Sequence, residues 1–452
     1  MNFDQRGDNN ISPDSSSGFT GGVNHTGAKR KRSFLQKGSL AYLTALYASG
    51  TTTGSILRMI SGVLAARFVE PATLGLFNGI GLVNSYAVFL HIGVLSALDR
   101  ELPYYIGKGE REKAYELASA AQAWALLLGI CTSALLLILA LTQAVLGRWQ
   151  LAAGWGTHAI GVFHTFFIMI YLLAIYRTQG EFGKLGAASV VRETTHLIMV
   201  VTVWLFGFYG LCIRNLAFVV INSAFLWRWR PLRVRSRWNW KNFRHLLKIG
   251  LPIFGVVQLY AYWEVLNLTL VLKIMGIEGM GLYSLAAMSG MISMLPQTMS
   301  KIIFPRMALQ FGSTENINDL FRMAVRPIIV LILVIIPIVY IAWMLLPTLV
   351  EFILPKYVDG IKAAQWTLLL SIIICMTPIN NIFNVVKRQE LYAIAIITGI
   401  AGYLVSLYLL IGKEPYLAGF PQSMLIGQSI FIIMCYAFIF MLKVKANKSP
   451  HT

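Results

Sequence analysis

The sequence predicts an all-α, polytopic membrane protein with about twelve transmembrane helices in two pseudo-symmetric six-helix lobes. Of the 452 residues, 57% are hydrophobic and 13% are charged, and the mean hydropathy is +0.65. A chain of this composition is too apolar for a soluble globular protein. Apolar runs of about 20 residues, the length that crosses a bilayer as a helix, recur along it. The runs lack the alternation of a transmembrane barrel, so we expect no strands.

The apolar runs define the expected spans. They cover roughly residues 40–66, 74–98, 118–146, 157–176, 187–206, 209–227, 249–273, 280–304, 324–347, 361–386, 390–411 and 416–442. Grouped by composition, they predict a disordered basic cytoplasmic tail (1–38), an N-terminal lobe (39–227), a basic aromatic interfacial linker (228–248), a C-terminal lobe (249–442) and a cytoplasmic tail (443–452). The first of these is rich in Gly, Ser, Asn and Asp, which is typical of disorder.

An internal repeat is the reason to expect two similar lobes. A turn at Arg67–Phe77 separates the first two spans, and a charged segment follows the second. After an offset of 206 residues, Met280–Tyr283 occupies the place of Leu74–Phe77, and another apolar helix and polar turn follow. Self-similarity of this size indicates a duplicated unit. In membrane proteins, a duplication of this kind points to a transporter whose site lies between the halves.

The basic residues orient the chain. The formal net charge is +19, but the Lys and Arg residues are not spread evenly. If the N-terminus lies on one side of the membrane, 30 of the 38 fall on that side, 6 fall on the other, and Arg58 and Arg214 lie within spans. This bias predicts cytoplasmic N- and C-termini. The four cysteines fall inside apolar spans, where packing is their expected role.

Arg228–Lys248 joins the two lobes and holds eight basic residues without an acid. Aromatic side chains interleave these charges, an arrangement typical of a segment in the headgroup layer. Basic and aromatic residues also bind single-stranded RNA. Because spans flank this linker on both sides, we expect anionic lipids, and no nucleic acid, as its partners.

Several ionisable residues lie inside the spans of the N-terminal lobe. Arg58 costs at least about 2.5 kcal/mol in lipid unless it faces protein or water, so it either faces inward or snorkels to the headgroups. Arg192 and His196 are four residues apart and share one helix face, which can form a cationic patch. A structural salt bridge from Arg192 to Glu193 is equally allowed. Arg214 is expected to snorkel.

The offset of the repeat relates Arg58 to Glu264 in the seventh span. Equivalent helices of a two-lobe transporter face each other across its central axis. We therefore predict a gating pair of Arg58 and Glu264, against the alternative of two unrelated snorkelling residues. Lys301 adds a cationic candidate near the eighth span, and Asn380 places an amide in the tenth, where it can bind a sugar hydroxyl or join two helices. The candidate substrate-binding residues are Arg58, Arg192, Lys301 and Asn380.

The first hairpin also carries a family resemblance. Ala66–Val69, followed by Glu70 and Pro71 and by Leu74–Phe77, resembles the "ARxLGPxxYGxY" hairpin of the polysaccharide transporter and oligosaccharide flippase family. This family is a branch of the multidrug, oligosaccharidyl-lipid and polysaccharide (MOP) exporter superfamily. Glu70 stands where the family often has Gly, a departure that concerns the local turn. The resemblance implies a MATE-like fold and alternating access driven by an ion gradient or the membrane potential, without a cofactor.

Together, the residues and the resemblance favour one function. The spans contain no nucleotide-binding loop, metal-ligand cluster or catalytic pair of carboxylates, so we expect a transporter with no catalytic residue and no metal. The expected substrate is a polyprenyl-pyrophosphate-linked oligosaccharide, such as an O-antigen, capsule or exopolysaccharide repeat unit. The protein would flip it across the cytoplasmic (inner) membrane, with a polysaccharide polymerase and export machinery as further partners.

Two alternatives remain open at this point. A multidrug or cation extruder of the same superfamily would bind cations and should carry intramembrane acids, a test that Glu264 alone leaves undecided. A membrane-embedded glycan polymerase or ligase would need a long outer loop with Arg and His. No predicted outer loop exceeds about 15 residues, which disfavours the enzyme.

Overall fold

The computed structural model describes residues 40–314, 316–412 and 415–448, and the segment from Leu43 onward forms one compact unit. The predicted tail at 1–38 and the last four residues of the chain lie outside the described residues. Within them, every regular element is helical. The first elements are α1 (Leu40–Phe68), α2 (Pro71–Ala87), η1 (Val88–His91), α3 (Val94–Gly107), α4 (Arg111–Val145), α5 (Trp149–His164), η2 (Thr165–Leu172), α6 (Leu173–Thr178), α7 (Phe182–Ile198) and α8 (Val200–Arg228).

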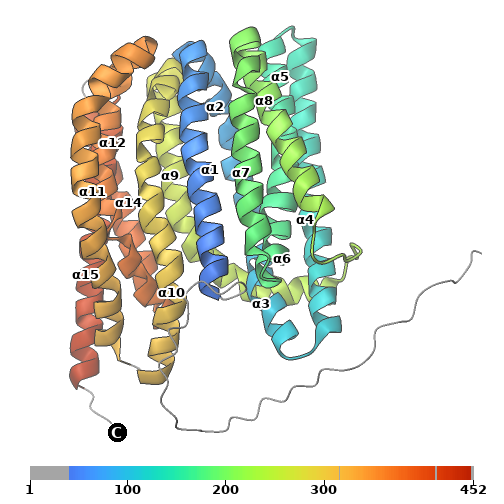
Figure 1. The fold of residues 1–452 in the computed structure, drawn as a ribbon, viewed down its shortest axis with the longest axis vertical. Helices are drawn as coiled ribbons and strands as arrows, with labels where there is room; N and C mark the ends of the chain where they lie inside the picture. The colour runs from blue at the N-terminus through green and yellow to red at the C-terminus, as the bar shows by residue number, and fades with distance from the viewer. Residues whose placement is uncertain (1–39, 315, 413–414, 449–452) are drawn as a thin grey trace, which may run out of the picture. The chain divides into compact units, whose positions relative to one another are not determined.

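The second half of the chain is built in the same way (Figure 1). Its elements are α9 (Trp240–Ser289), η3 (Gly290–Ser293), α10 (Met294–Thr314), α11 (Ile317–Ile353), η4 (Pro355–Gly360), α12 (Ile361–Ile374), η5 (Thr377–Asn380), α13 (Asn381–Val385), α14 (Gln389–Ile411) and α15 (Gly419–Lys448). Helix α11 packs against α12, and α15 packs against both α12 and α14; in the first half, α5 packs against both α4 and α8.

Nine helices in the described part are long and apolar enough to cross a membrane by length and composition. Two of the runs contain a turn. Gly207 in α8 and Gly276 in α9 have positive φ values of 53° and 72°, which glycine adopts without strain. Thr202 Oγ1 donates to Gly210 O, although eight residues of straight helix would place them about 12 Å apart, so the chain reverses at Gly207.

These reversals account for the expected twelve passes. Helix α7 and the start of α8 form one pass before Gly207, and the rest of α8 forms the next. The two arms of α9 on either side of Gly276 belong to separate passes, and the second continues into α10. Helix α1 adds the first pass of the chain. The all-helical, polytopic fold class predicted from the sequence is confirmed.

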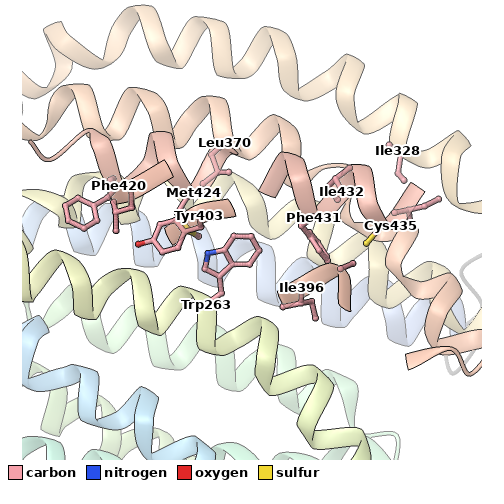
Figure 2. Packing of buried hydrophobic residues seen from close by; sticks show 14 of the residues in the cluster. Trp263, Ile328, Leu370, Ile396, Tyr403, Phe420, Met424, Phe431, Ile432 and Cys435 are labelled. Atoms are coloured by element: carbon pink, nitrogen blue, oxygen red, sulfur yellow. The ribbon is translucent and has the colours of Figure 1, made fainter. Parts of the chain in front are cut away.

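Each half of the chain has its own apolar core. In the first, buried side chains of α3 to α7 pack together with Leu226 of α8 and the start of α9. In the second, Trp263 of α9 packs against Tyr403 of α14 and Phe431 of α15, with ring centroids 6.2 and 6.3 Å apart (Figure 2). Neighbouring helices of the protein cover these side chains, so each half forms a packed helical bundle.

The two halves meet where α2 crosses the second arm of α9. A Cβ added at Gly75 would lie 1.8 Å from the carbonyl oxygen of Ile277, and one added at Gly281 would lie 1.8 Å from that of Pro71. Both contacts obey the repeat, since Gly281 lies 206 residues after Gly75 and Ile277 lies 206 after Pro71. Small residues permit such close helix approach. A pseudo-twofold axis therefore passes through this crossing.

The hairpin between α1 and α2 lies next to the crossing of α2 and α9 and contacts the second half of the chain. Glu70 has φ −73° and ψ 150°, an extended conformation open to any residue, so its departure from the family pattern leaves the turn intact. Its carboxylate lies 2.6 Å from Lys356 Nζ in η4. Tyr357 Oη donates to the carbonyl oxygen of Val69 over 3.4 Å. Both contacts join the first half of the chain to the second.

The basic aromatic segment is attached to the first half. The backbone N–H of Arg237 donates to Ser119 Oγ of α4, and Ser119 Oγ donates to the carbonyl oxygen of Arg235. Helix α9 then begins at Trp240, with the Asn239 side chain capping the backbone N–H of Asn242. Lys113 Nζ donates to Asn242 Oδ1 over 2.7 Å. The first turns of α9 are thereby held on α4.

Candidate functional site

A buried carboxylate on α7 binds two arginine side chains of the first half. Glu193 is fully buried, and its Oε1 accepts hydrogen bonds from Arg58 Nη2 at 2.6 Å and from Arg58 Nε at 3.0 Å. Arg192 Nε donates to the same oxygen over 2.7 Å. A buried carboxylate requires such partners, because an unpaired charge loses its hydration without compensation.

Two further residues complete this cluster. His196, one turn after Glu193, places Nδ1 3.5 Å from Glu193 Oε2. Arg214 of α8 donates from Nε to the carbonyl oxygen of His196 over 3.0 Å and from Nη2 to Ser61 Oγ over 2.5 Å. We call Arg58, Arg192, Arg214, Glu193 and His196 the arginine cluster. With His196 neutral, three arginines face one carboxylate, and the cluster has an excess of two positive charges.

Small residues bring α1 and α7 close enough to form this cluster. A Cβ at Gly50 would lie 2.6 Å from Gly186 Cα, and a Cβ at Gly54 would lie 2.6 Å from Ser189 Oγ. Gly50, Gly54 and Arg58 are spaced four residues apart and lie on one face of α1. The face that packs against α7 therefore continues into Arg58, which meets Glu193 about one turn beyond the last small residue.

One member of the arginine cluster, Arg192, lines a cavity of about 160 Å³ within the first half. Its polar lining comes from four helices: Thr51 of α1, Arg177 of α6, Arg192 of α7 and Asn222 of α8. Arg177 is already paired, since its Nη2 donates to both carboxylate oxygens of Asp99. In the part of the chain that the structure describes, the terminal nitrogens of Arg192 have no protein partner. They are available to an anion in this cavity.

The structure brings together two of the predicted substrate-binding residues. Arg58 and Arg192 share the Glu193 carboxylate, so the inward-facing interpretation of Arg58 agrees with the structure, although its side chain remains 38% exposed. Asn380 lies in η5, in the second half and apart from this cluster, and is buried. Lys301 belongs to α10, but its side chain lies outside the described part of the structure.

The predicted pair of Arg58 and Glu264 is not formed in this structure. The Arg58 guanidinium turns toward Glu193 within its own half, and Glu264 is exposed on α9 without an ion-pair partner among the described residues. The physical reason is burial: the Glu193 carboxylate is fully buried, lies within reach of Arg58 in the same half, and must be neutralised there.

The prediction that Arg214 snorkels is also wrong. Its guanidinium bonds Ser61 and the backbone of α7, within the cluster. A signal for this contact was present in the sequence. Ser61 lies three residues after Arg58 on the small-residue face of α1, so it is placed to receive a donor from the same direction.

Comparison with solved structures identifies the fold. The chain superposes on an inward-facing multidrug resistance MATE family transporter of the MOP superfamily with a TM-score of 0.71 and 16% identity, covering 90% of this chain and all of that one. An outward-facing MATE family transporter gives a TM-score of 0.63 with 16% identity, covering 90% of this chain and 97% of that one. The fold is that of the MOP superfamily.

A third match concerns a protein with a described binding pocket. It is a MOP superfamily transporter from Pyrococcus furiosus, described as having a pocket of reversed polarity that suggests a different function. The TM-score is 0.64 and the identity 18%, with 90% of this chain and 96% of that chain covered.

The family follows from the sequence itself. The model of the family described as "Polysaccharide biosynthesis protein" matches residues 63–358, more than half of the chain. The protein therefore belongs to this polysaccharide biosynthesis family, as the first hairpin predicted. None of the curated proteins matches the chain significantly.

Proposed function

We propose that the protein is a flippase that moves a polyprenyl-pyrophosphate-linked oligosaccharide across the cytoplasmic membrane by alternating access. The observation that carries this proposal is the charge of the arginine cluster. Arg58 and Arg192 share one carboxylate, Arg214 lies beside them, and the terminal nitrogens of Arg192, which have no partner among the described residues, face a cavity. A guanidinium presents planar pairs of donors that match phosphate oxygens. The ligand class that fits is an anion with several such oxygens, and pyrophosphate has them.

The cluster also holds its arginines in position without neutralising them. Glu193 accepts from Nε of both Arg58 and Arg192, the guanidinium nitrogen nearest the main chain, so the direction of each side chain is fixed. Among the described residues, Nε and Nη2 of Arg58 bond the carboxylate and Nη1 has no hydrogen-bond partner. Preorganised donors lose less entropy when a ligand binds. A ligand that binds one conformation better than the other shifts the equilibrium between them, which alternating access requires.

A cation extruder is the second candidate. The observation in its favour is Glu264, an exposed acid on α9 with no ion-pair partner among the described residues. The net positive charge of the arginine cluster repels organic cations from the first half.

The assignment to the polysaccharide biosynthesis family supports a role with polysaccharide intermediates. We further propose that a polysaccharide polymerase and export machinery are partners of the protein and that anionic lipids bind the basic segment. Both termini are proposed to lie on the cytoplasmic side.

A transport assay in proteoliposomes tests this function. Flipping of a fluorescent polyprenyl-pyrophosphate oligosaccharide is measured for the native protein and for Arg192→Gln, which keeps the size but removes the charge. We expect the variant to flip at least about tenfold more slowly, because a lost charge-assisted contact of about 1.4 kcal/mol or more gives that factor.

The matched control is Arg388→Gln, which removes an arginine that is half-exposed and paired with exposed Glu390. It should leave flipping unchanged. If the native protein leaves the lipid in place and expels organic cations instead, the flippase proposal is overturned in favour of the extruder.

A further inference from the structure

The segment that joins α8 to α9 carries positive charge that the protein itself does not neutralise. Arg228–Lys248 holds eight Lys and Arg residues and no acid, and none of the eight forms an ion pair among the residues that the structure describes. Acids on neighbouring helices bind other groups: Glu101 pairs with His245, and Glu116 pairs with Lys113. Like charges on one segment repel one another, so an anion from outside the protein stabilises them.

Arg230 is held on an indole ring at the start of this segment. Its Cζ lies 3.7 Å from the centroid of the Trp227 ring, and its Nη1 donates to the Trp227 carbonyl oxygen over 2.8 Å. The Trp227 ring in turn contacts Phe167 of η2, with ring centroids 5.3 Å apart. The other guanidinium nitrogens of Arg230, Nε and Nη2, have no hydrogen-bond partner in the described part of the chain. The cation–π contact thus fixes the guanidinium while two of its donors stay available.

Arg233 brings a second charge to the same place. Its side chain is exposed, and Leu232, beside it in the chain, packs against the apolar core of the first half. Partial burial, together with the nearby charge of Arg233, lowers the pKa of Arg230. Two guanidinium groups close enough to influence each other in this way can bind one phosphate group together, because each presents planar donors to its oxygens.

The two arginines lie where an apolar span ends. The run Val200–Arg228 is long and apolar enough to cross a membrane, and Arg230 and Arg233 follow it directly. Trp227 and Trp229 are 40% and 48% exposed, and exposed indole rings at the end of a span are typical of the headgroup layer. An anion at Arg230 therefore lies at the depth of lipid phosphates, which favours a lipid over a free phosphate or an RNA.

We propose that Arg230 and Arg233, with Trp227 as their platform, bind the headgroup phosphate of an anionic glycerophospholipid. This inference rests on the proposed function, which assigns anionic lipids to the basic segment, and it names the residues that bind one. The phosphate accepts from Nε and Nη2 of Arg230 and from the Arg233 guanidinium. Val220, Ala224 and Trp227 recur at helical spacing and are all exposed, so they form one face of α8 along which the acyl chains lie.

Native mass spectrometry of the full chain in detergent tests this site. The probes are dioleoylphosphatidylglycerol, which is anionic, and dioleoylphosphatidylcholine, which has the same acyl chains and no net charge. For the native protein we expect the first phosphatidylglycerol to bind at least about tenfold more tightly than the first phosphatidylcholine. The ratio of the two dissociation constants is the readout. Free glycerol phosphate, which lacks acyl chains, should not displace phosphatidylglycerol at equal concentration.

Two double variants assign that ratio to the site. Arg230→Gln with Arg233→Gln removes the proposed donors and should bring the ratio toward one. The matched control is Arg235→Gln with Arg237→Gln, which removes the same charge from the same segment and should retain the native ratio. Both control residues bond Ser119 through their backbone, so these contacts survive the substitutions. If thermal unfolding shows that the first double variant does not fold, Arg233→Gln alone, at an exposed position, decides the test by lowering the ratio.

The outcomes separate this site from transport. Equal affinity of the native protein for both lipids, or an equal loss in the two double variants, overturns the site, the latter because the charge of the segment would then act as a whole. Displacement of phosphatidylglycerol by glycerol phosphate or by a short single-stranded RNA also overturns it, in favour of that ligand. None of these results involves Arg192, so the flippase proposal stands or falls on the flipping assay alone.

Discussion

Asn78 donates a hydrogen bond from Nδ2 to Ser284 Oγ over 2.8 Å, and the two residues are separated by 206 positions, the offset of the internal repeat. Equivalent residues of the two halves therefore touch each other. Two equivalent points can meet only where they lie on the axis that relates them. The contact places the pseudo-twofold axis between α2 and α9, at the end of the molecule where Gly75 and Gly281 also meet.

Locking this contact should stop transport. In a variant whose four native cysteines are replaced, Asn78→Cys with Ser284→Cys brings two thiols together on the axis, and a short bifunctional thiol reagent should join them. We expect flipping to stop after cross-linking, because opening of this end requires the two positions to part. Asn78→Cys alone, treated in the same way, is the control. Full transport by the cross-linked protein would show that this contact does not part during the cycle.

Adding a side chain at the glycine crossing should favour the opposite conformation. Gly281→Val places atoms within 1.8 Å of the Pro71 carbonyl oxygen, so the closed crossing becomes impossible without a backbone shift. A cysteine at position 284 should then react faster with a membrane-impermeant thiol reagent added from that side. Gly312→Val, at a glycine with open space around its Cβ position, should leave the reaction rate unchanged.

Removing the charge of Glu193 should destabilise the protein strongly. Glu193→Gln removes the carboxylate that Arg58 and Arg192 share, next to a third arginine, Arg214, and breaking a buried ion pair typically costs about 3–5 kcal/mol. We expect a clear fall in the unfolding temperature measured in detergent. For comparison, Glu116→Gln removes a half-exposed carboxylate 3.5 Å from Lys113, a change worth at most about 1 kcal/mol. Similar losses for the two variants would argue against a central role for Glu193.

The cap at the start of α9 can be tested separately from the cap of α11. Asn239→Ala removes the side-chain acceptor for the N–H of Asn242, and Asn316→Ala does the same for Asn318. Each loss costs about 1 kcal/mol of helix stability. By hydrogen exchange we expect faster exchange at the start of α9 in the first variant and at the start of α11 in the second. Loosening of both helices by either single change would contradict the local role of these caps.

The fold was largely accessible from the sequence because lipid imposes simple rules. Backbone groups in a bilayer must bond within the chain, so apolar runs of sufficient length become helices. The predicted break between the fifth and sixth spans falls at Gly207, and the break between the seventh and eighth falls at Gly276. Helices α1 and α7 do not meet the length and composition criteria that the nine other runs meet, however. Helix α7 has 17 residues, and α1 is rich in Gly, Ser and Thr, which lower its hydropathy.

The candidate site was only partly accessible. Arg58 and Arg192 stand out as charges inside spans, but the sequence cannot rank the possible partners of a charge. The repeat offset pointed from Arg58 to Glu264, whereas the structure pairs Arg58 with Glu193. Residues related by the 206-residue repeat touch each other only near the pseudo-twofold axis, where Asn78 and Ser284 lie. Arg58 lies away from this axis and bonds the nearest buried carboxylate, that of Glu193.

The attachment of the basic segment to α4 has a mechanical consequence. Ser119 and Lys113 fasten residues 235–242 to the first half, and farther along α9, Gly250 packs so closely against Gly93 that an added Cβ would lie 2.0 Å from the Gly93 oxygen. The next helical irregularity is Pro252, which lacks an N–H and removes one hydrogen bond from α9. In the proposed alternating-access cycle, we therefore expect α9 to bend near Pro252, while the turns of α9 before Pro252 stay attached to the first half.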